Sequence, residues 1–351
     1  MYINFVTDEN KNIYIRYWLL LTINLVVIMI IVGGLTRLTD SGLSIVEWNI
    51  FSGIFPPIFS NDWMELFDKY KQFPEFKLIN KNINLDEFKF IFWMEYIHRI
   101  WGRLIFLIFL IPLIIFLRKK YIPEKFKKHF FIILSLILLQ GLSGWYMVKS
   151  GLIDKPDVSH YRLSIHLLMA FIIYGYLLFL TFSIYDLKNK KKKKIIKNKN
   201  FFITNVILIC LILLTVFSGG MVAGLDAGLI YNTFPLMGNT LIPFDIWNLS
   251  PRFINFLENP VTVQFNHRIL GITTFILTIV LWSYTRIHNL PLSIKKKVNF
   301  LLLIAIIQVS FGVATLVSYV AIPVAIIHQL GALVFYTISI WTLKSLPFVS
   351  K

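Results

Sequence analysis

The sequence predicts an all-α polytopic membrane protein with eight transmembrane helices. Of its 351 residues, 57% are hydrophobic and 15% are charged, whereas a soluble domain is near half apolar and about a quarter charged. The mean hydropathy is +0.70. The apolar residues form continuous runs rather than the alternating segments of about 10 residues typical of membrane β-barrels. Together these observations exclude a soluble enzyme, a disordered protein and a disulfide scaffold.

Each predicted span is an apolar run of about 20 residues, the length that crosses a hydrocarbon core about 30 Å thick. A long polar stretch, 36–89, separates the first run from the second. Basic stretches end the second, fourth and sixth runs, and other polar loops end the third, fifth and seventh. The eight predicted spans are Tyr17–Leu35, Phe90–Leu117, Phe130–Val148, Tyr161–Tyr185, Phe201–Gly224, Val261–Thr285, Val298–Val317 and Ala321–Leu343.

The distribution of basic residues predicts the orientation. The connections after spans two, four and six carry six, eight and four Lys or Arg residues. The positive-inside rule places these connections, and therefore both termini, in the cytoplasm. These clusters also account for the net charge of +17, so we expect no nucleic-acid partner. The first 16 residues resemble neither a mitochondrial presequence nor a cleavable signal peptide, which favours a bacterial inner (cytoplasmic) membrane.

Four landmarks occur in the same order in both halves of the chain. They are Gly33-Gly34 and Gly219-Gly220, His98-Arg99 and His267-Arg268, Gln140…Gly144 and Gln308…Gly312, and His166 and His328. They predict two tandem four-helix bundles related by a pseudo-twofold axis along the membrane normal. The expected divisions are an N-terminal half (1–187), a basic cytoplasmic linker (188–200) and a C-terminal half (201–351).

Four histidines lie inside the spans, one pair in each half: His98 with His166, and His267 with His328. They precede the first charge at the inner end of their spans by 20, 20, 19 and 16 residues. At about 1.5 Å per residue, all four lie at one level near the outer, periplasmic face. Two facing imidazoles can supply both axial ligands of a haem iron.

We therefore expect one bis-histidine haem site in each half. For each histidine alone, a hydrogen-bonding role in the core is the alternative. A zinc or copper site is a rival, but no carboxylate or cysteine cluster completes one, and Cys210 is the single cysteine. Arg99 and Arg268 follow the first histidine of each pair. They are candidates either for contacts with haem propionates or for snorkelling to the interface.

The repeat is broken at Glu95, the candidate catalytic residue. Glu95 lies three residues before His98 and hence on the same helical face. The matching residue is Gln264, which cannot exchange a proton at ordinary pH. The difference predicts chemistry in the first half and a permanent haem in the second. The structural alternative is that Glu95 is hydrogen-bonded to a neighbouring helix and sets the register of the two helices.

These residues carry a resemblance to the heme A synthase (CtaA/Cox15) family, which extends over the whole chain. The matching stretches are 33–44 with Glu47-Trp48, 95–103, 226–237 and 264–271. The chain lacks the cysteine pair that some bacterial members carry in the first outer loop. It is therefore most similar to the alphaproteobacterial and mitochondrial branch.

The resemblance implies oxidation of the C8 methyl group of haem O to the formyl group of haem A, for cytochrome oxidase biogenesis. It implies that His98 and His166 bind the substrate haem and that His267 and His328 are the axial ligands of a haem b cofactor. Glu95 would stabilise positive charge on the oxidised carbon or act as a base toward water. The implied partners are haem O synthase, cytochrome c oxidase biogenesis factors and a membrane electron acceptor. A homo-oligomeric state is left open.

Two other functions stay open at this stage. A cytochrome b-type membrane oxidoreductase also uses bis-histidine haems, but it stacks them across the membrane, which the single level of the four histidines disfavours. A non-catalytic haem carrier or oxidase assembly factor has no need for an ionisable Glu95 beside one haem alone. The other acids of the first outer loop are Glu47, Asp62, Glu65 and Asp68. They either cap the substrate site or are solvated, and solvation is the expected role for all but Glu47, which lies in a motif.

Overall fold

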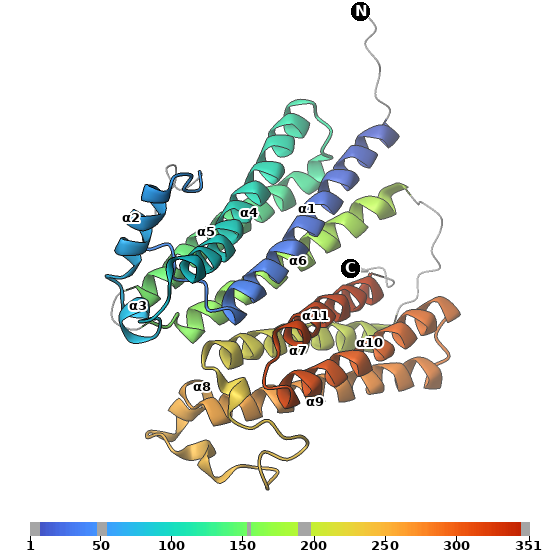
Figure 1. The fold of residues 1–351 in the computed structure, drawn as a ribbon. Coiled ribbons are helices and arrows are strands. Elements are labelled where there is room, and N and C mark those ends of the chain that lie inside the picture. Colours follow the sequence, from blue (N-terminus) through green and yellow to red (C-terminus); the bar gives the residue numbers. More distant parts are fainter. Residues whose placement is uncertain (1–7, 48–54, 153–155, 189–197, 345–351) are drawn as a thin grey trace, which may run out of the picture.

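The computed structural model describes residues 8–47, 55–152, 156–188 and 198–344 (Figure 1). Eight helices in this part of the chain are long and apolar enough to cross a membrane, which confirms the predicted fold class. They are α1 (Asp8–Leu38), α4 (Leu85–Arg118), α5 (Glu124–Gly151), α6 (His160–Lys188), α7 (Lys199–Gly224), α9 (Pro260–Ile287), α10 (Leu292–Val317) and α11 (Ile322–Leu343). Seven of these helices are longer than the predicted spans, because their ends continue past the apolar runs, and α11 begins one residue later than predicted and ends at the same residue.

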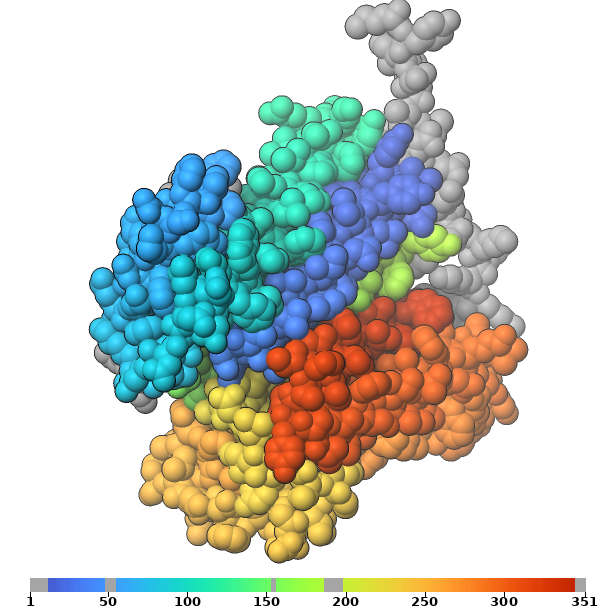
Figure 2. Space-filling model, viewed as in Figure 1, coloured from blue at the N-terminus to red at the C-terminus, as the bar shows by residue number. Residues whose placement is uncertain are grey.

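The helices of each half pack in the same cyclic order. In the first half α1 contacts α4, α4 contacts α5, α5 contacts α6 and α6 returns to α1. In the second half α7, α9, α10 and α11 repeat these pairings. Between the halves, α6 packs on α7 while α11 packs on α1, and α6 also meets α11 (Figures 1 and 2). An internal duplication with a twofold relation would produce such reciprocal contacts. The duplication itself stays a prediction. Residues 189–197 of the expected linker lie outside the described residues.

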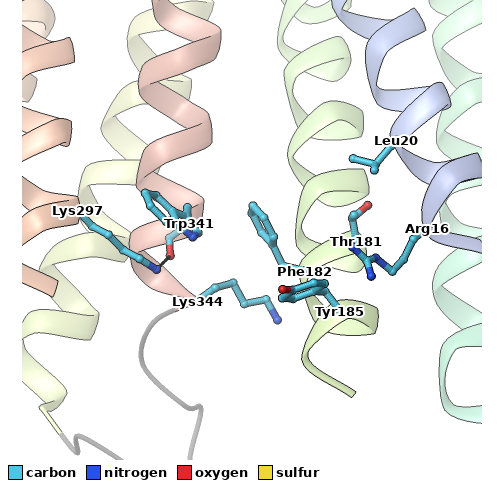
Figure 3. A pocket seen from close by; sticks show the side chains of 8 residues that line it. All are labelled: Arg16, Leu20, Thr181, Phe182, Tyr185, Lys297, Trp341 and Lys344. Atoms are coloured by element: carbon cyan, nitrogen blue, oxygen red, sulfur yellow. Dashed lines mark hydrogen bonds between the residues drawn. The ribbon is translucent and has the colours of Figure 1, made fainter. Parts of the chain in front are cut away.

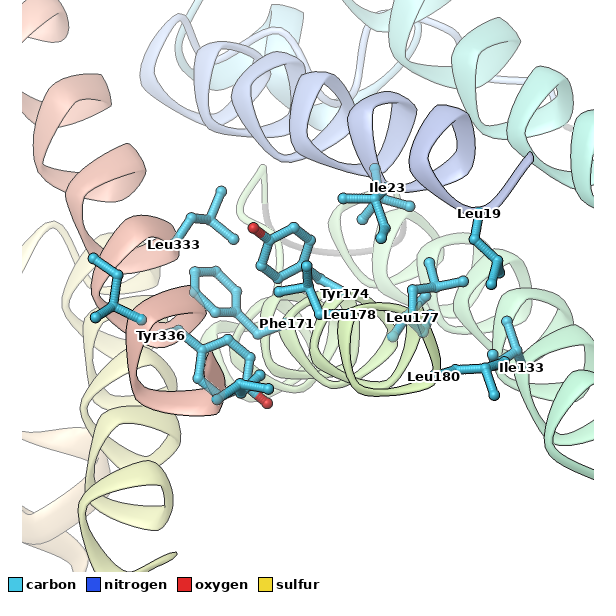
Figure 4. Close-up of a cluster of buried hydrophobic side chains, with 14 of the residues drawn as sticks. Leu19, Ile23, Ile133, Phe171, Tyr174, Leu177, Leu178, Leu180, Leu333 and Tyr336 are labelled. Carbon is cyan, nitrogen blue, oxygen red and sulfur yellow. The ribbon is translucent and has the colours of Figure 1, made fainter. Parts of the chain in front are cut away.

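Large apolar side chains fill the interface between the halves (Figure 4). Phe171 and Tyr174 of α6 face Tyr336 of α11, and the Tyr336 hydroxyl lies directly against Gly175. The Tyr174 and Thr337 hydroxyls are 2.6 Å apart. A side chain at residue 175 would collide with Tyr336, so the glycine permits this close approach of α6 and α11.

The second glycine of each Gly-Gly pair also lies at this interface. A Cβ atom on Gly34 of α1 would stand 3.0 Å from Cδ1 of Ile326 on α11. A Cβ atom on Gly220 of α7 would stand 2.8 Å from Cα of Ser164 on α6. The two halves therefore approach each other through glycines at equivalent landmarks.

In the connection between α1 and α4, the described residues 55–84 form a cap on the first turns of α4. Two short helices, α2 (Ser60–Tyr70) and α3 (Pro74–Leu78), lie beside these turns (Figure 1). Five buried residues hold them there: Trp63, Tyr70, Phe88, Ile91 and Phe92. Asn84 begins α4 with a capping box, because its side chain accepts hydrogen bonds from two backbone amides while Glu87 accepts one from the Asn84 amide.

The second half has a smaller cap between α7 and α9. It consists of three 3₁₀ turns (Ala227–Leu229, Phe244–Trp247 and Arg252–Ile254) and α8 (Asn255–Glu258). Asn259 fixes the start of α9, since its side chain accepts from the Val261 amide and donates to the Asp245 carbonyl. Both caps lie at the end of the bundle opposite the first turn of α1 and the last turn of α11 (Figure 1).

Candidate functional site

Each of the four predicted histidine ligands faces a glycine on a neighbouring helix. A Cβ atom built on the glycine would stand 3.4 Å from Cε1 of His98 at Gly33, 3.1 Å from Cε1 of His166 at Gly144, 3.2 Å from Cε1 of His267 at Gly219 and 2.9 Å from Cε1 of His328 at Gly312. Glycine thus leaves the space that each imidazole ring occupies. These four glycines belong to the landmarks of the sequence repeat, which did not indicate that they touch the histidines.

In each half, the two histidines and the two glycines that face them come from four different helices. In the first half, α1 and α5 supply the glycines and α4 and α6 supply His98 and His166. In the second half, α7 and α10 supply the glycines and α9 and α11 supply His267 and His328. The structure therefore places the two members of each predicted pair within one ring of four packed helices.

Polar side chains orient three of the rings. Ser143 Oγ lies 2.8 Å from Nδ1 of His166, and Ser218 Oγ lies 2.7 Å from Nδ1 of His267. Gln308 Nε2 lies 3.2 Å from Nδ1 of His328. Nδ1 of His166 and Nδ1 of His267 can donate to these serine oxygens, which leaves Nε2 as the ligand atom, the usual arrangement at metal sites. The Gln308 amide nitrogen is instead a donor to Nδ1 of His328, so ligation through Nε2 requires the Gln308 amide to turn its oxygen toward Nδ1.

The donor set fits a haem iron with two axial imidazoles in each half. One contact must change on binding, because Gln140 Nε2 lies 3.2 Å from Nε2 of His166. The carbonyl oxygens of the Gln140 and Gln308 side chains are buried without a hydrogen-bond partner. These glutamines therefore have an acceptor available for a new donor once the ring is engaged.

Glu95 is 3% exposed and its carboxylate is fully surrounded by donors. Oε2 accepts hydrogen bonds from Ser44 Oγ at 2.7 Å and from the Ile45 amide at 2.8 Å. Oε1 accepts from Nε and Nη2 of Arg99 at 3.0 and 2.6 Å. Arg99 in turn donates to the carbonyls of Ile45 and Glu47. The pair fastens the start of the outer loop to α4, one turn before His98.

The second half repeats this anchor without the negative charge. Gln264 Nε2 donates to the Tyr231 carbonyl at 3.0 Å, and Arg268 Nη2 donates to the same oxygen at 2.8 Å. Arg268 also donates to the carbonyl of Thr233. Both arginines thus hold an outer loop above a histidine, and a propionate contact would add to these bonds. The carboxylate of Glu95 is the feature that the second half lacks.

An arginine between the halves was not singled out from the sequence. Nη1 of Arg37, at the end of α1, lies 2.5 Å from Asp40, and Nη2 lies 2.7 Å from Asp226 of the second half. Arg37 also donates to the Ala223 carbonyl. Asp40 and Asp226 both have left-handed backbones, with φ of 46° and 48°. All three lie within the motif stretches, so the resemblance was the signal that could have found them.

The outer-loop acids divide into exposed and buried groups. Glu47 and Glu65 pair with Lys69, Asp68 pairs with Lys71, and Asp62 accepts from backbone amides at the start of α2. Glu75, by contrast, is 5% exposed, and its Oε2 has no hydrogen-bond partner. Burial raises the pKa of Glu75 to about 7, against the lowering effect of a hydrogen bond with Tyr70. Composition gave no sign of this buried acid.

The comparisons with known proteins agree with this architecture. The family model described as COX15-CtaA, cytochrome oxidase assembly protein, matches residues 16–340. The chain is 44% identical to a heme A synthase of Nitrosospira multiformis over 329 residues, 93% of this chain and 92% of the relative. It is 42% identical to heme A synthase COX15 of Homo sapiens over 342 residues, 95% of this chain and 83% of the relative. A heme A synthase of Rickettsia felis is 43% identical over 333 residues, 93% of this chain and 96% of the relative.

Proposed function

The chain belongs to the heme A synthase (COX15-CtaA) family of cytochrome oxidase assembly proteins, and from this membership we propose that it oxidises the C8 methyl group of haem O to the formyl group of haem A. The family membership predicted from the motifs is thereby confirmed. The formyl oxygen would come from water, four protons would be released, and the four electrons removed from the methyl group would pass to a membrane electron acceptor. The observation that carries the proposal is the difference between two similar sites. Each half has a pair of histidines that face glycines, and among the described residues a buried carboxylate, Glu95, accompanies the first pair where the second has Gln264.

We assign the substrate to the first half. His98 of α4 and His166 of α6 would hold the substrate haem, while Gly33 and Gly144 make room for the two imidazole rings. The aromatic cap of α2 on α4 would limit the access of water to this site from the outer face. The equivalent ligands of the second half, His267 and His328, would hold a resident haem b. That group, when bound, would supply a redox centre within the same membrane protein.

Glu95 would have two roles, to supply negative charge at the substrate site and to hold the loop that begins at Ser44. As a carboxylate it accepts bonds from Ser44, Ile45 and Arg99, so its lone pairs are already engaged. Of the two roles considered, charge stabilisation therefore fits this geometry better than proton abstraction from water. The same bonds fix the outer loop above His98. This arrangement supports different functions for the two halves, because Gln264 also anchors a loop but carries no charge.

The test is conversion of haem O by the protein in a membrane that otherwise makes no haem A. We would express the full chain together with a haem O synthase in such a host and extract the non-covalent haems. Haem A should appear with this chain and be absent from the host with the synthase alone. Bound haem b without haem A would instead support the haem carrier, the second function considered above.

The orientation and the wider role follow the same proposal. The lysine-rich connections would face the cytoplasm of a bacterial cell, with both haem sites near the periplasmic side of the inner membrane. Haem O synthase and cytochrome c oxidase biogenesis factors would be the functional partners. The halves 1–187 and 201–351 would then be a substrate domain and a cofactor domain.

A further inference from the structure

A cavity of about 300 Å³ lies between the two halves, far from the four histidines (Figure 3). The first half lines it with Arg16, Leu20, Thr181, Phe182 and Tyr185, and the second half lines it with Lys297, Trp341 and Lys344. Thr181 follows His166 by 15 residues on α6, which corresponds to about 22 Å along the helix. The cavity therefore belongs to neither proposed haem site.

The charge of the lining is entirely positive. Three of the eight lining side chains are basic and none of the eight is acidic. The Arg16 guanidinium lies 4.5 Å from the centre of the Tyr185 ring, and its Nε is buried without a hydrogen-bond partner. An unsatisfied guanidinium nitrogen at a cavity is a donor that an anionic oxygen could use.

The two lysines reach the cavity from the other half. Lys344 Nζ lies 3.6 Å from the Phe179 ring centre and donates to Ser183 Oγ at 2.6 Å. Lys297 Nζ lies 4.1 Å from the Trp341 ring centre and donates to the Trp341 carbonyl at 3.3 Å. Each ammonium group therefore has an aromatic ring and a neutral oxygen among its contacts. Figure 3 shows the hydrogen bond from Lys297 to Trp341.

The position in the bundle indicates the kind of ligand. Arg16 is near the start of α1, Tyr185 and Lys344 are near the ends of α6 and α11, and Lys297 is near the start of α10. This is the end that carries the lysine-rich connections, at the level of the lipid headgroups, where Trp and Tyr rings are enriched. Basic pockets between transmembrane helices on this side bind anionic headgroups.

We propose that this cavity binds the phosphate of an anionic phospholipid headgroup and that the lipid thereby bridges the two halves. Arg16 would bind the phosphate from the first half, and Lys297 and Lys344 would bind it from the second. Leu20 and Phe182 offer apolar surface for the part of an acyl chain nearest the headgroup. This function is separate from haem oxidation, and it is measurable in protein that contains no haem.

The test is lipid binding to the purified full-length protein by native mass spectrometry. We would titrate detergent-solubilised protein with phosphatidylglycerol and with phosphatidylcholine, and repeat the titration in the presence of inorganic phosphate. The variant combines Arg16→Gln, Lys297→Gln and Lys344→Gln. The matched control combines Arg118→Gln, Lys125→Gln and Lys296→Gln, which remove the same charge from exposed residues outside the cavity.

We expect wild-type protein and the control to prefer phosphatidylglycerol, and the cavity variant to bind it roughly 10- to 100-fold more weakly. Arg16→Gln alone, a milder change, should show a smaller loss if the triple variant does not fold. Equal losses in both triple variants, or equal binding of the two lipids by wild type, would overturn the proposal. Displacement of phosphatidylglycerol by inorganic phosphate would also overturn it, because the site would then be one for free phosphate.

Discussion

Gly312 on α10 faces His328 on α11 so closely that a methyl group on Gly312 would stand 2.9 Å from Cε1 of the imidazole. Real Cβ atoms are almost never that close to another heavy atom, so the ring or its helix would have to move. The same relationship, at 3.1–3.4 Å, joins the other three glycines to their histidines. A side chain would be too close to the ring at Gly312 and tight at Gly144 and Gly219, whereas at Gly33 it would make ordinary contact with His98.

The first prediction is that Gly312→Ala lowers the haem b content of the purified protein several-fold. Alanine is a better helix former than glycine by about 0.5–1 kcal/mol, so a loss of haem could not come from weaker helix propensity. Gly271→Ala on α9 is the matched control, because a Cβ atom there would meet nothing within 4 Å. Equal haem content in both variants would show that the Gly312 cradle is not needed for ligation.

The second prediction concerns the ligands themselves. His267→Ala and His328→Ala should each abolish the low-spin bis-histidine spectrum of the resident haem, because either change leaves the iron with one protein ligand. His98→Ala and His166→Ala should keep that spectrum while they lose conversion of haem O. Optical spectra of the four purified variants distinguish the two halves. Retention of the spectrum in both second-half variants would place the cofactor elsewhere.

The third prediction concerns pH and the buried acid Glu75. Its pKa is raised from the ordinary 4.5 to about 7 by burial, so the folded state keeps a proton that the unfolded state releases. Its contribution to stability is therefore complete below pH 4.5 and is lost as the pH rises to about 7. The loss would be at most about 3 kcal/mol.

Glu75→Gln should remove that component of the pH dependence, since the amide carries no proton to release. Thermal unfolding of the full-length protein between pH 4.5 and 8 measures how its stability depends on pH, and Glu65→Gln at an exposed residue is the control. Wild type and Glu75→Gln with parallel pH profiles would mean that Glu75 is not protonated in the folded protein.

The fourth prediction concerns orientation. A reporter that is active only in the cytoplasm should be active when fused after Lys120, between α4 and α5, and silent when fused after Asn239, in the second cap. The reason is the positive-inside rule, by which the basic residues around Lys120 would keep that connection in the cytoplasm. Activity in the reverse pattern would place the histidines near the cytoplasmic face.

The sequence predicted the eight helices because a bilayer imposes a length and an apolar composition that can be counted. It also placed Glu95 and Gln264 at equivalent positions, and the structure shows that both anchor an outer loop beside an arginine. It could not predict that Ser44 and Ile45 bind the carboxylate, because the contact joins residues about 50 positions apart through an irregular loop.

Other parts of the site depend on how helices approach each other. Gly33 and Gly34 are adjacent in the sequence, yet one faces His98 and the other faces α11. The serines at Nδ1 of His166 and His267 are not equivalent in the repeat, so no pattern indicated them. The cavity between Arg16 and Lys344 combines residues from opposite ends of the chain, which only the packing of the two halves brings together.

The most direct test of the unequal halves is the haem content of membranes that carry Glu95→Gln together with haem O synthase. Glutamine keeps the volume of Glu95, but its amide nitrogen must replace an oxygen that accepts from donors, so bound haem b serves as the control for folding. Haem b should remain bound while haem A formation falls by about two orders of magnitude, the scale expected for loss of a positioned charge. Glu65→Gln should leave haem A unchanged. Haem A at the wild-type level in Glu95→Gln would contradict the account, because the charge would then have no part in the chemistry.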